Sequence, residues 1–173
     1  QAGSDRILKR MNRTYTSKEF LNLVDKIRQY IPNCALTTDI IVGFPGETED
    51  EFLETLSVAE KVEFNSAYMF KYSSRPGTKA SQYDEQITED EKQDRLERLI
   101  DLQLNKTLMQ NKKHVGKISK VLVEKVSKKS NDQWSGRTEG GTWVVFDKTN
   151  EKIGDIIDVK IDDARGVTLF GSR

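Results

Sequence analysis

The sequence predicts an α/β part followed by an all-β part. Up to about residue 113, strand-like apolar runs alternate with amphipathic helical segments, which is typical of parallel βα units. Three of these helices open with the same Thr-x-x-Glu capping pattern. Beyond residue 113, short β-type runs are separated by turn residues. We therefore expect two domains, 1–112 and 113–173, and we interpret the first as the closing part of a larger sheet or barrel.

The composition excludes several classes of protein. No apolar run approaches the roughly 18 residues that span a bilayer, and no signal-peptide pattern opens the chain. With one cysteine and one histidine, the sequence predicts neither an internal disulfide nor a metal site, and we expect Cys34 to be buried. The charge is uneven: residues 1–109 carry −4 and residues 110–173 carry +4. We expect a cytoplasmic protein with a basic module.

The elements of the first part are predicted from the spacing of apolar residues and from the residues that begin or end helices. We expect helices at 5–11, 16–31, 49–62 and 88–113, and strands at 35–42 and 67–72. Pro32 ends the second helix. The residues expected to face inward from the helices are Phe20, Leu23, Val24, Ile27, Ile31, Phe52, Leu56, Ala59, Val62, Leu96, Leu99, Ile100, Gln103 and Thr107.

The stretch TTDIIVGFPGET, residues 37–48, is the most informative part of this α/β segment. Its continuous apolar run indicates a strand buried on both faces, and ligands of such sheets bind at the carboxyl ends of the strands. Residues 43–47 are therefore the predicted ligand-facing loop, although a plain βα turn explains the glycines equally well. Asp39 inside this strand either points to the ligand side or is satisfied by the backbone.

The second part predicts a small closed barrel of OB-like type. Five antiparallel strands are expected at 117–126, 134–139, 142–147, 154–161 and 166–171. Such barrels bind single-stranded nucleic acid through basic and aromatic side chains on one face. The candidates are Lys125, Lys128, Lys129, Trp134, Arg137, Trp143 and Arg165. The alternative is that the tryptophans are core residues and the lysines only solvate strand edges.

Taken in order, these motifs resemble one family over the whole chain. The carrying features are QAGSD at 1–5, MNRTYT at 11–16, TDIIVGFPGET at 38–48, YSSRPGT at 72–78 and SGRT at 135–138. They are similar to the C-terminal part of the radical-SAM methylthiotransferases. In that family an open, TIM-like βα barrel is followed by a TRAM domain, a small β-barrel that binds RNA. Residues 115–171 resemble such a domain.

The resemblance implies a function and a set of site residues. It implies S-adenosyl-L-methionine as cofactor, two [4Fe–4S] clusters, and addition of a methylthio group to C2 of N6-dimethylallyladenosine at position 37 of tRNA. Threonylcarbamoyladenosine in tRNA, a ribosomal protein and a non-catalytic RNA-binding role are the alternatives. The implied cofactor-side residues are Gln1, Ser4, Arg13, Ile41, Gly43, Tyr72 and Ser73, and Asp39 and Arg75 are candidates for the substrate side.

The sequence departs from the family in its cysteines. The family holds its clusters on several thiolates, and this chain has one cysteine in another context. We therefore expect the chain to hold no metal and to be inactive alone. A partial barrel also leaves strand edges exposed, from which we expect self-association.

Overall fold

The computed structural model describes residues 1–173 and contains two compact units, Gln1–Gln103 and Leu104–Arg173. The first is α/β and the second is a closed β-barrel, so the predicted fold class is confirmed. The units meet in sequence within helix α4, Glu89–Lys112. The expected domain boundary at 112/113 stays a prediction.

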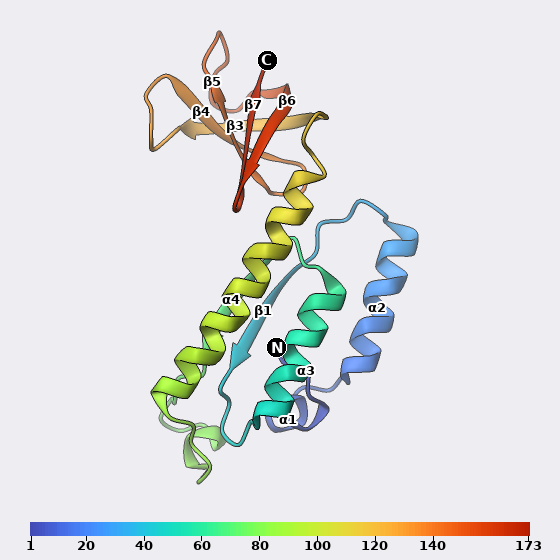
Figure 1. Ribbon diagram of the computed structural model, residues 1–173, viewed down its shortest axis with the longest axis vertical. Helices are drawn as coiled ribbons and strands as arrows, with labels where there is room; N and C mark the ends of the chain where they lie inside the picture. Colours follow the sequence, from blue (N-terminus) through green and yellow to red (C-terminus); the bar gives the residue numbers. More distant parts are fainter. The chain divides into compact units, whose positions relative to one another are not determined.

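The first unit contains two parallel strands, two helices before them, one helix between them and the start of a fourth helix after them; Figure 1 labels the four helices and the first strand. The helices are α1 (Asp5–Arg10), α2 (Ser17–Tyr30), α3 (Glu49–Val62) and α4, with a short 3₁₀ helix, η1 (Lys79–Gln82). Strands β1 (Thr37–Val42) and β2 (Ser66–Lys71) pair in parallel over their whole length. Each predicted element of this unit lies within two residues of its expected range. No helix combines the length and apolar character needed to cross a membrane.

The capping patterns fix where the helices begin. Reciprocal capping boxes join Thr16 to Glu19 at α2 and Thr48 to Glu51 at α3. At α4 the amide of Glu91 donates to the Thr88 hydroxyl at 3.3 Å. Each cap satisfies backbone N–H groups that have no partner inside the helix, which explains why the pattern located these starts.

Helices α3 and α4 cover one face of the β1–β2 sheet. Ile40 and Val42 point to that face and pack with Phe52 and Ala59 of α3 and Leu99 of α4. A second cluster joins α2 to α3 and contains Val24, Val62 and Phe64. These contacts place the carboxyl end of β1 beside the first turns of α3 and α4.

The other face of the sheet is open, so the prediction that β1 is buried on both faces is wrong. Asp39 is exposed, and on β2 Tyr68 and Phe70 are 66% and 52% exposed. Leu23 of α2 and Ile31, which directly follows α2, are also exposed, because only part of the expected apolar stripe meets α3. Cys34 is exposed in the turn after α2, which corrects the expectation of a buried thiol.

The second unit is a five-stranded closed barrel that follows the end of α4. Its strands are β3 (Ile118–Val126), β4 (Gln133–Thr138), β5 (Trp143–Asp147), β6 (Ile156–Arg165) and β7 (Thr168–Ser172). They are ordered β3-β4-β5-β7-β6, with β6 pairing back to β3. The β5–β7 pair is parallel, which corrects the prediction that all pairs are antiparallel. This pairing closes the barrel and leaves no strand edge free.

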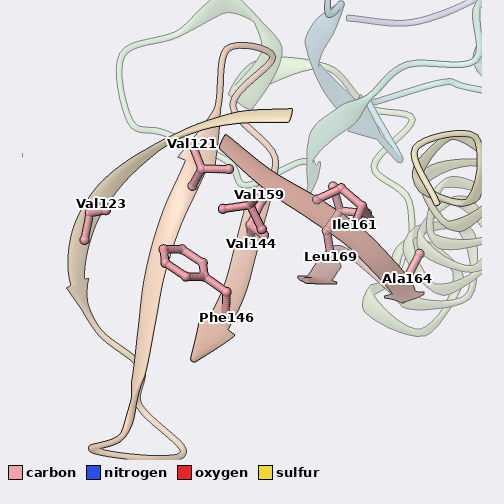
Figure 2. Close-up of a cluster of buried hydrophobic side chains, with 8 residues drawn as sticks. All are labelled: Val121, Val123, Val144, Phe146, Val159, Ile161, Ala164 and Leu169. Atoms are coloured by element: carbon pink, nitrogen blue, oxygen red, sulfur yellow. The ribbon is translucent and has the colours of Figure 1, made fainter. Parts of the chain in front are cut away.

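Alternate residues of these strands fill the barrel interior. Figure 2 shows the eight buried side chains: Val121, Val123, Val144, Phe146, Val159, Ile161, Ala164 and Leu169. Gly136 and Gly171 also face inward, where a Cβ would collide with the carbonyl oxygens of Leu122 and Lys160. The narrow barrel therefore needs glycine at both positions, and the residues between these inward positions form its outer face.

Candidate cofactor and nucleic-acid sites

The open face of the β1–β2 sheet is the first candidate site. Because paired residues of neighbouring parallel strands share a face, Asp39 lies beside Tyr68 and Ile41 lies beside Phe70. Ile41 is half-buried, while the other three are exposed. The face therefore presents a carboxylate next to aromatic and aliphatic surface.

Gln1 borders this face along the free edge of β1. Its carbonyl oxygen accepts a hydrogen bond from the Ile41 amide at 3.0 Å, and its Nε2 donates to the Asp39 carbonyl at 3.4 Å. The structure thus brings Gln1, Asp39 and Ile41 together, whereas Arg13 is exposed in the segment after α1 and its amide donates to the Leu8 carbonyl at 2.9 Å.

The loop at 43–47 is folded inward. Gly43 has φ +70°, is buried, and donates its N–H to Oε2 of Glu47 at 2.7 Å. Phe44 packs edge-on against Tyr72 with ring centroids 5.2 Å apart. Since the Gly43 amide is already bonded, a cofactor could meet this glycine only through its carbonyl or Cα, and the expected exposed glycine backbone is not found.

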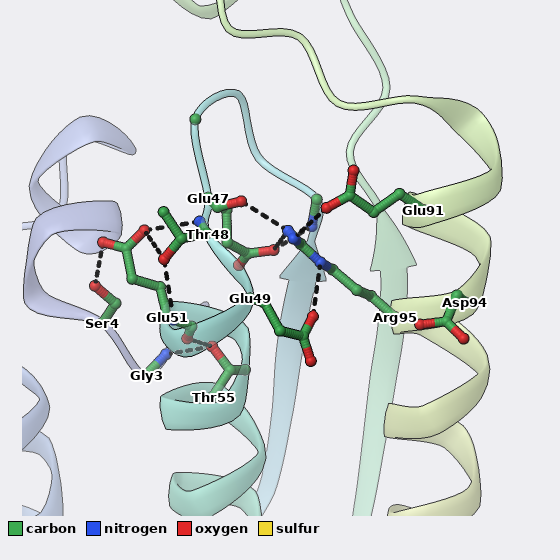
Figure 3. A network of polar contacts seen from close by, with 12 residues as sticks. Gly3, Ser4, Glu47, Thr48, Glu49, Glu51, Thr55, Glu91, Asp94 and Arg95 are labelled. Atoms are coloured by element: carbon green, nitrogen blue, oxygen red, sulfur yellow. Dashed lines mark hydrogen bonds and ion pairs between the residues drawn. The ribbon is translucent and has the colours of Figure 1, made fainter.

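A fully buried arginine holds this loop (Figure 3). Arg95 of α4 is 1% exposed, and its Nη1 donates to both the backbone oxygen and Oε2 of Glu47 at 2.9 and 2.8 Å. Its Nη2 donates to Glu91 at 2.5 Å. Burial raises the pKa of Glu47, whereas the Gly43 amide and Arg95 lower it. The buried charges of Glu47 and Arg95 compensate each other, and no sequence pattern indicated this pair.

A second polar cluster at the start of α3 includes Ser4. The Ser4 hydroxyl donates to Oε1 of Glu51 at 3.0 Å, and Arg6 donates to both carboxylate oxygens of Glu51 (Figure 3 draws the Ser4 bond). The Arg6 hydrogen bond and, after it, the Thr48 amide lower the pKa of Glu51 to about 2, against the opposing effect of burial. Ser4 is 3% exposed, and its hydroxyl is used in the hydrogen bond to Glu51 inside the protein. This placement contradicts its expected role facing a cofactor.

The segment after β2 places its candidates differently. The Tyr72 amide donates to the Val42 carbonyl at 2.8 Å, and the Tyr72 hydroxyl is buried without a hydrogen-bond partner. Ser73 and Arg75 are exposed. The Arg75 carbonyl accepts hydrogen bonds from Thr78, which fixes the turn but leaves the guanidinium available.

The outer face of the barrel is the second candidate site. Arg137 on β4 pairs with Trp143 on β5, and Trp143 pairs with Thr168 on β7. Lys125 Nζ lies 4.1 Å from the Trp143 ring centroid, and the Arg137 guanidinium carbon lies 5.3 Å from it. The guanidinium carbon of Arg165, the last residue of β6, lies 4.9 Å from the Phe170 ring centroid. Three of the predicted cations thus lie within cation–π distance of an aromatic ring, namely Lys125, Arg137 and Arg165.

Trp134, by contrast, belongs to the core side. It pairs with Phe146, packs against the core cluster, and buries an Nε1 that has no partner. The expectation that it contacts RNA is therefore not supported by its position. Lys128 and Lys129 are exposed in the β3–β4 turn and make no contact with the aromatic rings. Strands β4 and β5 alternate regularly, with Val144 and Phe146 inward and Trp143 outward. The sequence did not indicate which of the two alternating sets faces the core, so it could not tell the two tryptophans apart.

Comparison with known proteins identifies the family of this arrangement. The radical SAM superfamily matches residues 1–59, and the TRAM domain matches residues 112–172. The chain is 47% identical over 172 residues to the tRNA-2-methylthio-N(6)-dimethylallyladenosine synthase of Christiangramia forsetii, covering 99% of this chain and 36% of that protein. The chain belongs to the radical SAM methylthiotransferase family.

Two further members of the radical SAM methylthiotransferase family agree with this assignment. Proteins with the same name from Fusobacterium nucleatum and Clostridium tetani are 49% and 48% identical over 171 and 173 residues. The matches cover 99% and 100% of this chain, and 39% and 38% of those proteins. The chain therefore spans 36–39% of the length of these curated relatives. It contains no group of three or more His, Cys, Asp or Glu residues placed to hold a metal ion.

Proposed function

We propose that the protein is a tRNA methylthiotransferase that adds a methylthio group to C2 of N6-dimethylallyladenosine, next to the anticodon. The proposal is supported by the near-complete match of this chain to synthases of that name. These relatives favour dimethylallyladenosine over threonylcarbamoyladenosine or a ribosomal protein as the substrate. A tRNA substrate is consistent with a cytoplasmic location. Neither the structure nor the relatives support self-association, and we do not propose it.

In this proposal the open β1–β2 face belongs to the site for S-adenosyl-L-methionine. Its properties suit the cofactor: the apolar surface of Ile41 and Phe70 offers contact to a flat adenine, and Asp39 with the Gln1 amide offers acceptor and donor groups. Arg13 supplies a planar cation for the methionyl carboxylate. Tyr72, with its unpartnered hydroxyl, and Ser73 border the same end of the sheet. The carbonyl of Gly43 completes this group, and Arg75 is proposed on the substrate side.

The iron–sulfur clusters do not fit this chain. One cysteine cannot ligate a cluster, so the thiolates for the two proposed [4Fe–4S] clusters would come from other residues of a full-length protein. Together with S-adenosyl-L-methionine, the clusters supply radical chemistry at the adenine ring. The residues of this chain bind and orient the cofactor and the tRNA.

The barrel would bind the tRNA. Its segment 110–173 carries a net charge of +4, and Lys125, Arg137 and Arg165 lie on its outer face. Lys128 and Lys129 extend this basic surface along the β3–β4 turn. Cations at these places attract the phosphate backbone whatever the base sequence.

The direct test is reconstitution of the intact protein with clusters, S-adenosyl-L-methionine and tRNA carrying N6-dimethylallyladenosine. We expect the methylthio nucleoside by mass spectrometry, and no product on the same tRNA lacking the dimethylallyl group. Product on threonylcarbamoyladenosine tRNA or on a ribosomal protein, with none on dimethylallyladenosine tRNA, would overturn the substrate assignment.

A further inference from the structure

We propose that Trp143 is a stacking platform for an unpaired RNA base and that Lys125 and Arg137 hold the phosphates beside it. The inference rests on the proposed binding of tRNA by the barrel and adds to it a defined subsite and a preference for unpaired nucleotides. Its starting observation is the group formed by Trp143, Lys125 and Arg137 on the outer face, which we call the Trp143 subsite.

The position of the ring suits stacking. Trp143 lies at the first residue of β5, flanked in the sheet by Arg137 and Thr168, and is half-buried. The neighbouring Val144 points into the core, so the backbone beneath the indole is fixed. A rigid aromatic ring with an outward face can accept the face of any base, since every base has a π-surface.

The residues on the ring are long and exposed. The Lys125 Nζ lies 4.1 Å from the ring centroid, so the ammonium now occupies the position that a base would take. A cation–π contact at an exposed site contributes only about 0.5–1 kcal/mol, and base–aromatic stacking about 1–3 kcal/mol. An incoming base can therefore displace Lys125, whose ammonium then remains beside the phosphate that follows the base.

The charges around the ring distinguish the two cations. Arg137 donates through Nε to Glu124 at 2.7 Å, which orients its guanidinium and offsets its charge. Arg165, elsewhere on the barrel, is paired in the same way with Asp163 at 2.7 Å. Lys125 forms no ion pair, so its charge is the uncompensated one at the subsite. We expect Lys125 to contribute most to the salt dependence of binding.

The second tryptophan provides an internal contrast. Trp134 pairs with Phe146 and packs against the core, although Lys148 Nζ also lies 4.4 Å from its ring. The chain has two tryptophans, and they differ in the face of the barrel that they occupy. Replacing either one by phenylalanine therefore leaves a single fluorescent reporter on a known side of the barrel wall.

The test uses the full 173-residue chain and two RNAs of equal length. One is an anticodon stem-loop with an unpaired loop, and the other is a fully paired duplex. In Trp134→Phe, which retains Trp143, we expect the stem-loop to quench the fluorescence, whereas in Trp143→Phe we expect little change. Trp143→Leu should weaken stem-loop binding about 5- to 100-fold and duplex binding much less.

The matched charge variants are Lys125→Gln and Lys152→Gln, each of which removes one exposed lysine charge. Only Lys125→Gln should reduce the dependence of log K on log salt, by about one. Circular dichroism and thermal unfolding establish that each variant is folded. Unchanged stem-loop affinity in folded Trp143→Leu, or equal weakening for both RNAs, would overturn the subsite. Failure of both RNAs to bind the unaltered chain would instead contradict the proposed tRNA binding.

Discussion

At the residue scale, the loop after β1 depends on a glycine in two ways. Gly43 has φ +70°, a conformation that costs other residues about 1–2 kcal/mol. A Cβ at this position would also lie 2.5 Å from Cγ of Lys92, which is 5% exposed and cannot move freely. The motif flagged this glycine, but only the structure shows that it serves a closed loop.

A pair of alanine substitutions separates the two effects. Gly77 has φ +83°, and a Cβ added there would meet no atom within 4 Å, so Gly77→Ala carries only the conformational cost. We expect Gly77→Ala to lower the free energy of unfolding by about 1–2 kcal/mol. Gly43→Ala should add about 1–3 kcal/mol from overpacking against Lys92. Urea unfolding of both variants measures the difference, and equal losses would contradict the contact.

At the scale of single elements, α4 shows what the sequence could and could not predict. Its start follows from Thr88 and its inward stripe from helical spacing around Leu99. Arg95 lies four residues before Leu99, on the same side, yet in a helix rich in Glu, Asp, Lys and Arg nothing distinguished it from Arg98. The distinction comes from Glu47, 48 residues earlier, and such a long-range pairing leaves no local pattern.

The same helix offers a matched test of the buried pair. Arg95→Met removes the cation from a buried carboxylate and should lower the free energy of unfolding by about 3–5 kcal/mol. Arg98 is half-exposed, pairs with Glu49 and Asp94, and should lose less than about 1 kcal/mol as Arg98→Met. The double variant Arg95→Met/Glu47→Gln should recover part of the loss, because the carboxylate charge is then gone. Denaturant unfolding with no recovery in the double variant would contradict this explanation.

The sequence predicted where each strand lies in the chain, but not which of its faces is covered or which strand it pairs with. All seven lie within two residues of the predicted ranges at their starts, because alternation and turn residues are local signals. The apolar run of β1 could not reveal that Asp39, Tyr68 and Phe70 share an uncovered face, since coverage depends on what packs there. Likewise, the parallel β5–β7 pair joins strands separated by β6, and no local pattern encodes it.

At the scale of the whole molecule, each unit contributes one surface. The first unit offers the open β1–β2 face, bordered by Gln1, for the proposed cofactor. The second offers the outer barrel face around Trp143 for RNA. The family resemblance implied the cofactor-side residues and the barrel pattern suggested the RNA-side candidates, and both sets of roles stay predictions. The buried position of Ser4 and the core-packed position of Trp134 do not support these roles, because neither a motif nor alternation distinguishes a side chain that binds a ligand from one that stabilises the fold.

The central claim is that the first unit binds the cofactor and the barrel binds RNA. Hydrogen exchange of the intact, cluster-loaded protein, followed by mass spectrometry, tests this claim most directly. With S-adenosyl-L-methionine, exchange should slow in residues 39–43 and 68–73 and stay unchanged in α2. With tRNA, it should slow in residues 122–126 and 135–145. Cofactor-dependent protection that spares 39–43 and 68–73 would contradict the assignment of the open sheet face to the cofactor.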